Sequence, residues 1–161
     1  APVPIERRFE IYADRTEVIE QRYPAAGKNN VRIELIEYRF EGEQHLGVPL
    51  GTETDIYLAR AGYTRDGAVW FQRQSRDQRT LDLIRWDRST GISRSLLSET
   101  APDWVNLHDD LRFLRDGRFL WSSEREGYRQ LELRAADGKL LHAVTRGKGW
   151  QVDALLAVDE R

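Results

Sequence analysis

The residues of this sequence that could ligate a metal or transfer protons are three histidines and a larger number of carboxylates. His45, His108 and His142 lie far apart and do not form the closely spaced pair that a helical zinc site requires. His108 is followed by Asp109 and Asp110, a run that would suit an acid–base or metal cluster. Adjacent side chains of an extended segment point apart, however, which favours a solvated loop. We therefore expect no metal site and no cofactor.

A nucleophilic serine on a strand-to-helix elbow would lie in a Gly-x-Ser-x-Gly motif. The nearest approach, Gly91-Ile92-Ser93-Arg94-Ser95, lacks the second glycine and falls in a predicted turn between two strands. A phosphate-binding loop is not indicated either, because Gly147-Lys148-Gly149 has neither the required spacing nor a following helix. The sequence thus predicts no catalytic residue in this chain.

The charge and composition exclude several classes of partner. The 161 residues include 25 basic and 27 acidic side chains without a block of one sign, giving a net charge of −2. Nucleic acid and acidic membrane surfaces require a concentrated basic face, so neither is an expected partner. Cysteine is absent, which excludes disulfides and Cys-ligated metals. No apolar run approaches the roughly 20 residues of a membrane span.

An internal repeat is the most informative feature of the sequence. Arg65-Asp66-Gly67 recurs as Arg115-Asp116-Gly117, at an offset of 50 residues. The same offset pairs apolar positions beyond this motif, among them Phe71 with Trp121, Leu81 with Leu131, and Leu83 with Leu133. A match at a fixed period of this length is typical of stacked or radial repeat folds.

Each repeat unit predicts four strands joined by short turns. The first unit has candidate strands at 55–63, 68–71, 81–84 and 95–97, and the second at 111–114, 119–121, 131–133 and 140–145. Asp-Gly between apolar runs favours a hairpin, since the turn requires a positive φ that glycine adopts without strain. The pattern predicts an all-β chain built as a partial β-propeller of about two and a half antiparallel blades. A β-sandwich with an accidental internal match is the alternative fold.

The expected organisation follows from these units. Residues 1–50 are an incomplete blade, with a third strand at 31–38 and a short fourth at 46–48, and residues 51–103 and 104–150 are blades. Residues 151–161 are the first strand of the next blade, with the strand itself at 152–158. Both ends should then present unpaired strand edges, which favour pairing with another chain.

Several segments resemble one known family. Tyr23-Pro24-Ala25-Ala26-Gly27-Lys28-Asn29-Asn30 is similar to the Tyr-Pro-x-Ala-Gly-x-x-Asn motif of the dipeptidyl peptidase IV family, serine exopeptidases of the prolyl oligopeptidase clan. Three later stretches resemble the bacterial members in the same order: 104–110, 122–129 and 149–152. Together these segments extend over nearly the whole chain.

The resemblance implies an eight-bladed amino-terminal propeller above a carboxy-terminal α/β-hydrolase domain, in an enzyme that removes dipeptides with penultimate proline or alanine. It places the serine peptidase triad in the hydrolase domain and the amine-binding glutamate pair before the segments matched here, so this chain alone should be inactive. The substrate-side loop would include Trp104, Asn106 and His108. The implied partners are the hydrolase domain, peptide substrates and further copies in a homo-oligomer, and the implied location is the periplasm or another exported compartment.

Two other functions fit a propeller. A kelch-like or WD-repeat scaffold that binds a protein partner is compatible with the 50-residue period, although the kelch diglycines and WD dipeptides are missing. A propeller glycosidase would require paired carboxylates about 5 to 9 Å apart across a central cavity.

Overall fold

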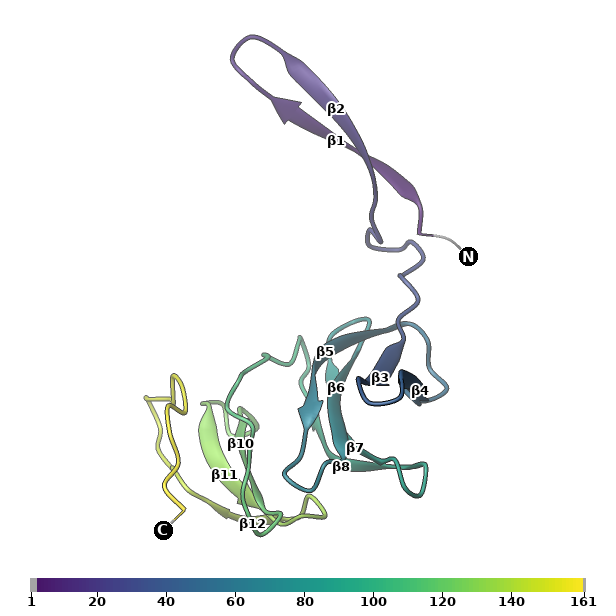
Figure 1. Cartoon of the computed structure of the whole chain (residues 1–161). Helices are drawn as coiled ribbons and strands as arrows, with labels where there is room; N and C mark the ends of the chain where they lie inside the picture. The colour runs from purple at the N-terminus through teal and green to yellow at the C-terminus, as the bar shows by residue number, and fades with distance from the viewer. Residues whose placement is uncertain (1–2, 161) are drawn as a thin grey trace.

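A computed structural model describes residues 3–160, and these residues form strands, turns and irregular segments without a helix. The strands make four antiparallel sheets, two of four strands and two of two strands. Accordingly, this part of the chain contains no helix long and apolar enough to cross a membrane. Figure 1 shows the sheets of the main body side by side, with one hairpin projecting away from it.

The first complete blade has four strands in sequential order: β5 (Ile56–Tyr63), β6 (Val69–Ser75), β7 (Thr80–Asp87) and β8 (Ile92–Thr100). The turn between β5 and β6 closes as predicted, since Gly67 has a φ of 83° and Thr64 N donates to Ala68 O at 2.8 Å. Ser93 pairs with Trp86 in the β7–β8 ladder. The Gly91–Ser95 segment is therefore part of a hairpin and not a nucleophile elbow.

The second complete blade repeats this order with β9 (Arg112–Phe113), β10 (Phe119–Ser123), β11 (Gln130–Arg134) and β12 (Leu140–Ala143). Every residue of β10 and β11 is buried, as expected for central strands that are covered on both faces. The register of this central pair is two residues different from that of the first blade: Gln72 pairs with Leu83, but Ser122 pairs with Leu131. A shift by an even number keeps each side chain on its face, so the 50-residue repeat of apolar positions survives it.

The core lies between the blades. Seven buried apolar side chains from the two complete blades pack into one cluster: Leu81, Leu83, Leu96, Leu97, Leu111, Phe119 and Trp121. A second cluster joins the first complete blade to the small sheet before it, through Val48, Val69, Phe71, Ile84 and Trp86. These three sheets thus pack in chain order, each on the next. This arrangement confirms the predicted fold class, a partial β-propeller.

The small sheet consists of β3 (Leu35–Arg39) and β4 (Gln44–Val48). It occupies the position that the sequence predicted for the outer strands of the first, incomplete blade. The first of these strands is shorter than the predicted segment 31–38, because residues 31–34 have no ladder partner.

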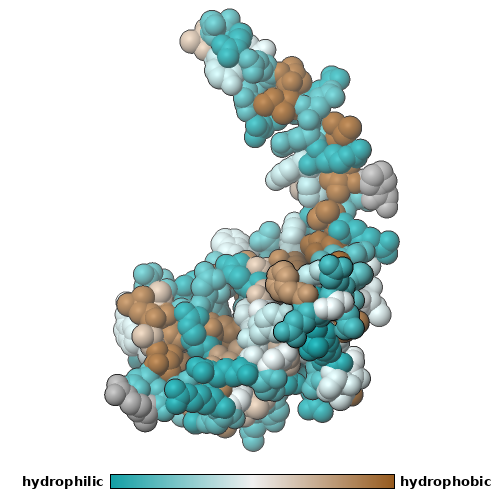
Figure 2. All heavy atoms as spheres, in the orientation of Figure 1, coloured by the Kyte–Doolittle hydropathy of each residue, from teal (hydrophilic) through white to brown (hydrophobic). Residues whose placement is uncertain are grey.

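The projecting hairpin consists of β1 (Ile5–Ile11) and β2 (Thr16–Arg22), and the sequence analysis did not predict it. Most of its apolar side chains are exposed, including Phe9, Ile11 and Val18. Figure 2 shows apolar atoms along this hairpin, outside the packed body. No other element of the described chain covers either face of the hairpin.

The carboxy-terminal segment also differs from its prediction. The strand expected at 152–158 is not formed, and residues 151–160 have no strand ladder. The physical reason is that the described chain offers this segment no second strand of its own blade. Side chains hold it instead: Asp110 Oδ1 accepts from Leu155 N at 2.7 Å, and Glu160 accepts from Arg115 N at 2.7 Å.

Candidate functional site

A cavity of about 150 Å³ lies between the two complete blades. It is formed by the segment that connects β8 to β9 and by the hairpin tip between β10 and β11. Its wall includes Trp104, Asn106 and His108 from the connector, Glu99 and Thr100 from the end of β8, and Trp121, Glu124, Arg125 and Arg129 from the second blade. The three residues that the sequence analysis selected as a substrate-side loop therefore line one cavity.

The rim of the cavity is a chain of side-chain hydrogen bonds. Trp104 Nε1 donates to Asn106 Oδ1 at 3.1 Å, and Asn106 Nδ2 donates to Glu124 Oε2 at 2.7 Å. The other oxygen of Glu124 accepts from Arg129 Nε at 3.2 Å. Trp104 is 60% exposed, so this network holds a large apolar side chain at the mouth of the cavity.

The floor of the cavity contains a buried carboxylate, that of Glu99. It accepts hydrogen bonds from Trp121 Nε1 at 3.2 Å, Ser123 Oγ at 3.1 Å and Arg125 NH2 at 2.8 Å. A buried carboxylate without such partners would be strongly destabilising, and here the cation and two neutral donors all come from the second blade. Glu99 therefore ties the end of β8 to the neighbouring blade and is not free to act as a base.

His108 is a buried wall residue, 8% exposed, with its ring edge-on to Trp121 at a centroid distance of 4.4 Å. Its Nδ1 accepts from Asp110 N at 3.2 Å. Burial lowers the pKa of His108, and the carboxylate of Asp110 opposes this effect only in part. The imidazole is thus neutral at neutral pH.

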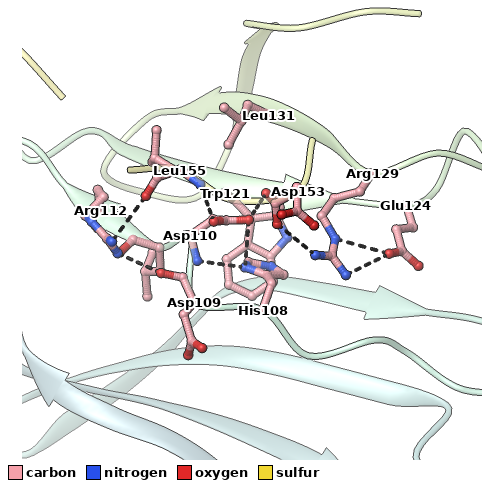
Figure 3. Close-up of polar contacts among 12 residues, drawn as sticks. His108, Asp109, Asp110, Arg112, Trp121, Glu124, Arg129, Leu131, Asp153 and Leu155 are labelled. Carbon is pink, nitrogen blue, oxygen red and sulfur yellow. Dashed lines mark hydrogen bonds and ion pairs between the residues drawn. The ribbon is translucent and has the colours of Figure 1, made fainter. Parts of the chain in front are cut away.

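The loop prediction for 108–110 was only partly right. Alternation places Asp109 outward, where its carboxylate pairs with Arg60 at 2.7 Å and its pKa is lowered by that contact. His108 and Asp110 point inward and are buried. Asp110 Oδ2 accepts from Ser122 Oγ at 2.6 Å, and Figure 3 shows Asp110 lying between the connector, Trp121 and the segment at Leu155.

The wall of this cavity carries hydroxyl, imidazole and carboxylate groups, and its two carboxylates, Glu99 and Glu124, are paired with arginines. Within residues 3–160, no three His, Cys, Asp or Glu side chains are grouped to hold a metal ion. The arrangement offers neutral hydrogen-bonding groups, an indole surface and balanced charges, which suit contact with a ligand.

Sequence reasoning found only the connector side of the cavity. Glu99, Glu124, Arg125 and Arg129 were not predicted as site residues. In both complete blades, the hairpin tip between the second and third strands contacts the segment that follows the fourth strand. Val105 N donates to Gln78 O in the first blade, and Val152 N donates to Arg129 O in the second. No local sequence pattern signals these contacts, because they join separate segments.

Comparison with known proteins gives consistent results. The family model described as the dipeptidyl peptidase IV (DPP IV) N-terminal region matches residues 1–161. The crystal structure of Porphyromonas gingivalis dipeptidyl peptidase 4 is similar to this chain with a TM-score of 0.80 and 24% identity, over 99% of this chain and 23% of that one. A putative dipeptidyl aminopeptidase IV from Bacteroides ovatus has a TM-score of 0.70 and 25% identity, over 84% of this chain and 20% of that one.

The chain spans less than a quarter of the length of these two solved proteins. The matches favour the peptidase family over the scaffold and glycosidase alternatives.

Proposed function

The chain belongs to the dipeptidyl peptidase IV family, whose amino-terminal region it matches over its whole length, and on that premise we propose that it is a non-catalytic propeller portion of a serine exopeptidase. The parent enzyme would release x-Pro and x-Ala dipeptides from peptide amino termini. The observation that carries this proposal is the match of the family model from residue 1 to residue 161.

In this proposal the propeller forms a wall of the chamber above a carboxy-terminal α/β-hydrolase domain, which supplies the serine, aspartate and histidine of the triad. The cavity between the blades supports a contact role, since its charged groups are paired and its mouth exposes an indole. Trp104 and Asn106 would contact the peptide or border its path, and His108 would support them from below as a neutral, buried ring.

The proposal is tested with an amino-terminal x-Pro chromogenic substrate, such as glycyl-prolyl-p-nitroanilide. The full-length polypeptide should release the chromophore, and the same substrate with a blocked amino terminus should not react. The 161-residue chain alone should hydrolyse neither. Activity in the short chain, or none in the full-length polypeptide, would refute the proposal.

We also propose that the full-length protein is an exported homo-oligomer. Export, to the periplasm or beyond, rests on the resemblance to bacterial family members alone. The oligomer is supported by the hairpin β1–β2, which projects from the body with Phe9, Ile11 and Val18 exposed. Apolar side chains on a projecting two-stranded ribbon are unfavourable in water and gain by burial against another copy. The paired hairpins would then share their apolar faces.

A further inference from the structure

We propose that Glu124 and Arg129 act together as positioning residues, holding the loop of Trp104 and Asn106 in the form that it presents to the peptide. This inference rests on the proposed function, and it adds two residues of the second blade to the substrate side of the chamber. Both residues belong to the chain of hydrogen bonds at the rim of the cavity.

The side-chain amide of Asn106 lies between two partners. Its oxygen accepts from Trp104 Nε1 at 3.1 Å, and its nitrogen donates to Glu124 Oε2 at 2.7 Å. An indole N–H can only donate and a carboxylate can only accept. A reversed amide would therefore place donor against donor and acceptor against acceptor. Glu124 and Trp104 together specify one orientation of Asn106.

Arg129 holds the carboxylate of Glu124. Its Oε1 lies 3.2 Å from both Nε and NH2 of Arg129, as Figure 3 shows for this pair. Arg129 NH1 also donates to Asp153 O at 3.5 Å. The carboxylate is thus fixed from the side opposite Asn106 by the guanidinium of Arg129. This guanidinium is itself largely buried and is anchored to the segment that follows β12. A planar guanidinium restricts the geometry of such a pair more than an ammonium does.

The network determines which groups the loop presents to a ligand. The network fixes the indole of Trp104, most of whose surface remains exposed, and it leaves the second N–H of the Asn106 amide available as a donor. Indole surfaces pack favourably against prolyl and aromatic rings. Because Arg129 balances the charge of Glu124, the rim remains close to neutral. Losing the network should weaken ground-state contacts with the peptide, without changing the groups that break the bond.

The experiment measures kcat and KM of the full-length enzyme on an x-Pro peptide substrate that extends beyond the scissile bond. Glu124→Ala should raise KM roughly five- to tenfold, a modest effect for the loss of a hydrogen bond to a charged group, with kcat within about twofold of wild type. Arg129→Ala should behave like Glu124→Ala, whereas Arg129→Lys, which keeps the positive charge but not the planar fork, should recover only part of the affinity.

The matched control is Glu126→Gln. Glu126 lies on the same hairpin tip, is exposed, and makes no hydrogen bond or ion pair with the described residues. This variant removes one negative charge close to the site without breaking the network, and it should leave KM unchanged.

Hydrogen exchange of residues 104–107 in the full-length protein gives a readout that does not depend on activity. Glu124→Ala should accelerate exchange in this segment, and Glu126→Gln should not. Unchanged KM and unchanged exchange in Glu124→Ala would overturn the inference, as would equal effects of the two glutamate variants. Absence of peptidase activity in the wild-type protein would instead overturn the proposed function, and the exchange experiment would still decide whether the pair positions the loop.

Discussion

Replacing Gly138 by alanine should separate the two complete blades, and replacing Gly91 should not. Both glycines end the turn between the third and fourth strands of a blade, and both have positive φ, 93° and 69°. An L-residue in this left-handed conformation costs about 1–2 kcal/mol. This contribution is shared by the two substitutions, so any difference between them reports on the surroundings.

The surroundings differ sharply. A Cβ added at Gly138 would lie 1.5 Å from Leu96 O and 2.4 Å from Leu96 C, whereas nothing lies within 4 Å of a Cβ added at Gly91. Atoms of this kind do not approach closer than 3.0 Å, so the turn and the backbone of β8 must move apart by about 1.5 Å, the difference of the two distances. Displacement of packed backbone costs a further 1–3 kcal/mol or so. Gly138→Ala should therefore destabilise by about 2–5 kcal/mol, and Gly91→Ala by about 1–2 kcal/mol.

The assay is thermal unfolding of the full-length polypeptide, combined with hydrogen exchange at Leu96 and Leu97. A loss of 1 kcal/mol of unfolding free energy lowers the Tm of a cooperatively unfolding part the size of this 161-residue chain by about 2–4 °C, so the two variants should be clearly resolved. Exchange at β8 should rise in Gly138→Ala and remain near wild type in Gly91→Ala. Equal shifts in Tm and equal exchange in the two variants would refute the close approach of the blades.

Three further predictions concern buried groups and the hairpin. Asp110→Ala should leave Ser122 Oγ and Leu155 N without their acceptor, at a cost of about 3 kcal/mol, so that exchange of the Leu155 amide rises about 100-fold. Because burial lowers the pKa of His108, the unfolded state binds a proton more readily; the stability due to the neutral imidazole is present above pH 6.5 and declines as the pH falls below that value. His108→Gln should therefore flatten the pH dependence of Tm in the acid range. Phe9→Glu should shift the full-length protein toward smaller species in size-exclusion chromatography with light scattering, if the projecting hairpin forms the oligomer.

Each of these three has a decisive negative result. Ser122→Ala is the control for Asp110, and it should leave exchange at Leu155 unchanged; rapid exchange in both variants would show general loosening. If the pH dependence of Tm persists in His108→Gln, groups other than His108 cause it. An unchanged oligomer in Phe9→Glu would exclude the hairpin as the contact.

Much of the fold was accessible from local patterns. The Asp66-Gly67 and Asp116-Gly117 turns were predicted because a positive φ at a hairpin turn is a property of the glycine itself. The buried strands β6, β7, β10 and β11 were predicted because their apolar positions recur at short spacing. Their pairing then follows from the short turns that join them.

The projecting hairpin and the carboxy-terminal segment were not predicted correctly. The hairpin lies outside the 50-residue repeat, and its Phe9, Ile11 and Val18 are exposed because nothing in the described chain covers them. The segment 152–158 has a strand-like sequence but no neighbour with which to form a ladder. In both cases the outcome depends on what lies beside the segment and not on its own residues.

By itself, the sequence determined the repeating four-stranded unit, the positions of its turns and the side chains that face inward. These features depend on residues within a few positions of one another. Only the tertiary structure decided that Glu99 would meet Trp121 and Arg125, and that Asn106 would be held between Trp104 and Glu124. The Glu99 contacts join two blades, and the Asn106–Glu124 contact joins the segment before β9 to the hairpin tip between β10 and β11. Their geometry is set by tertiary packing, which no short sequence pattern encodes.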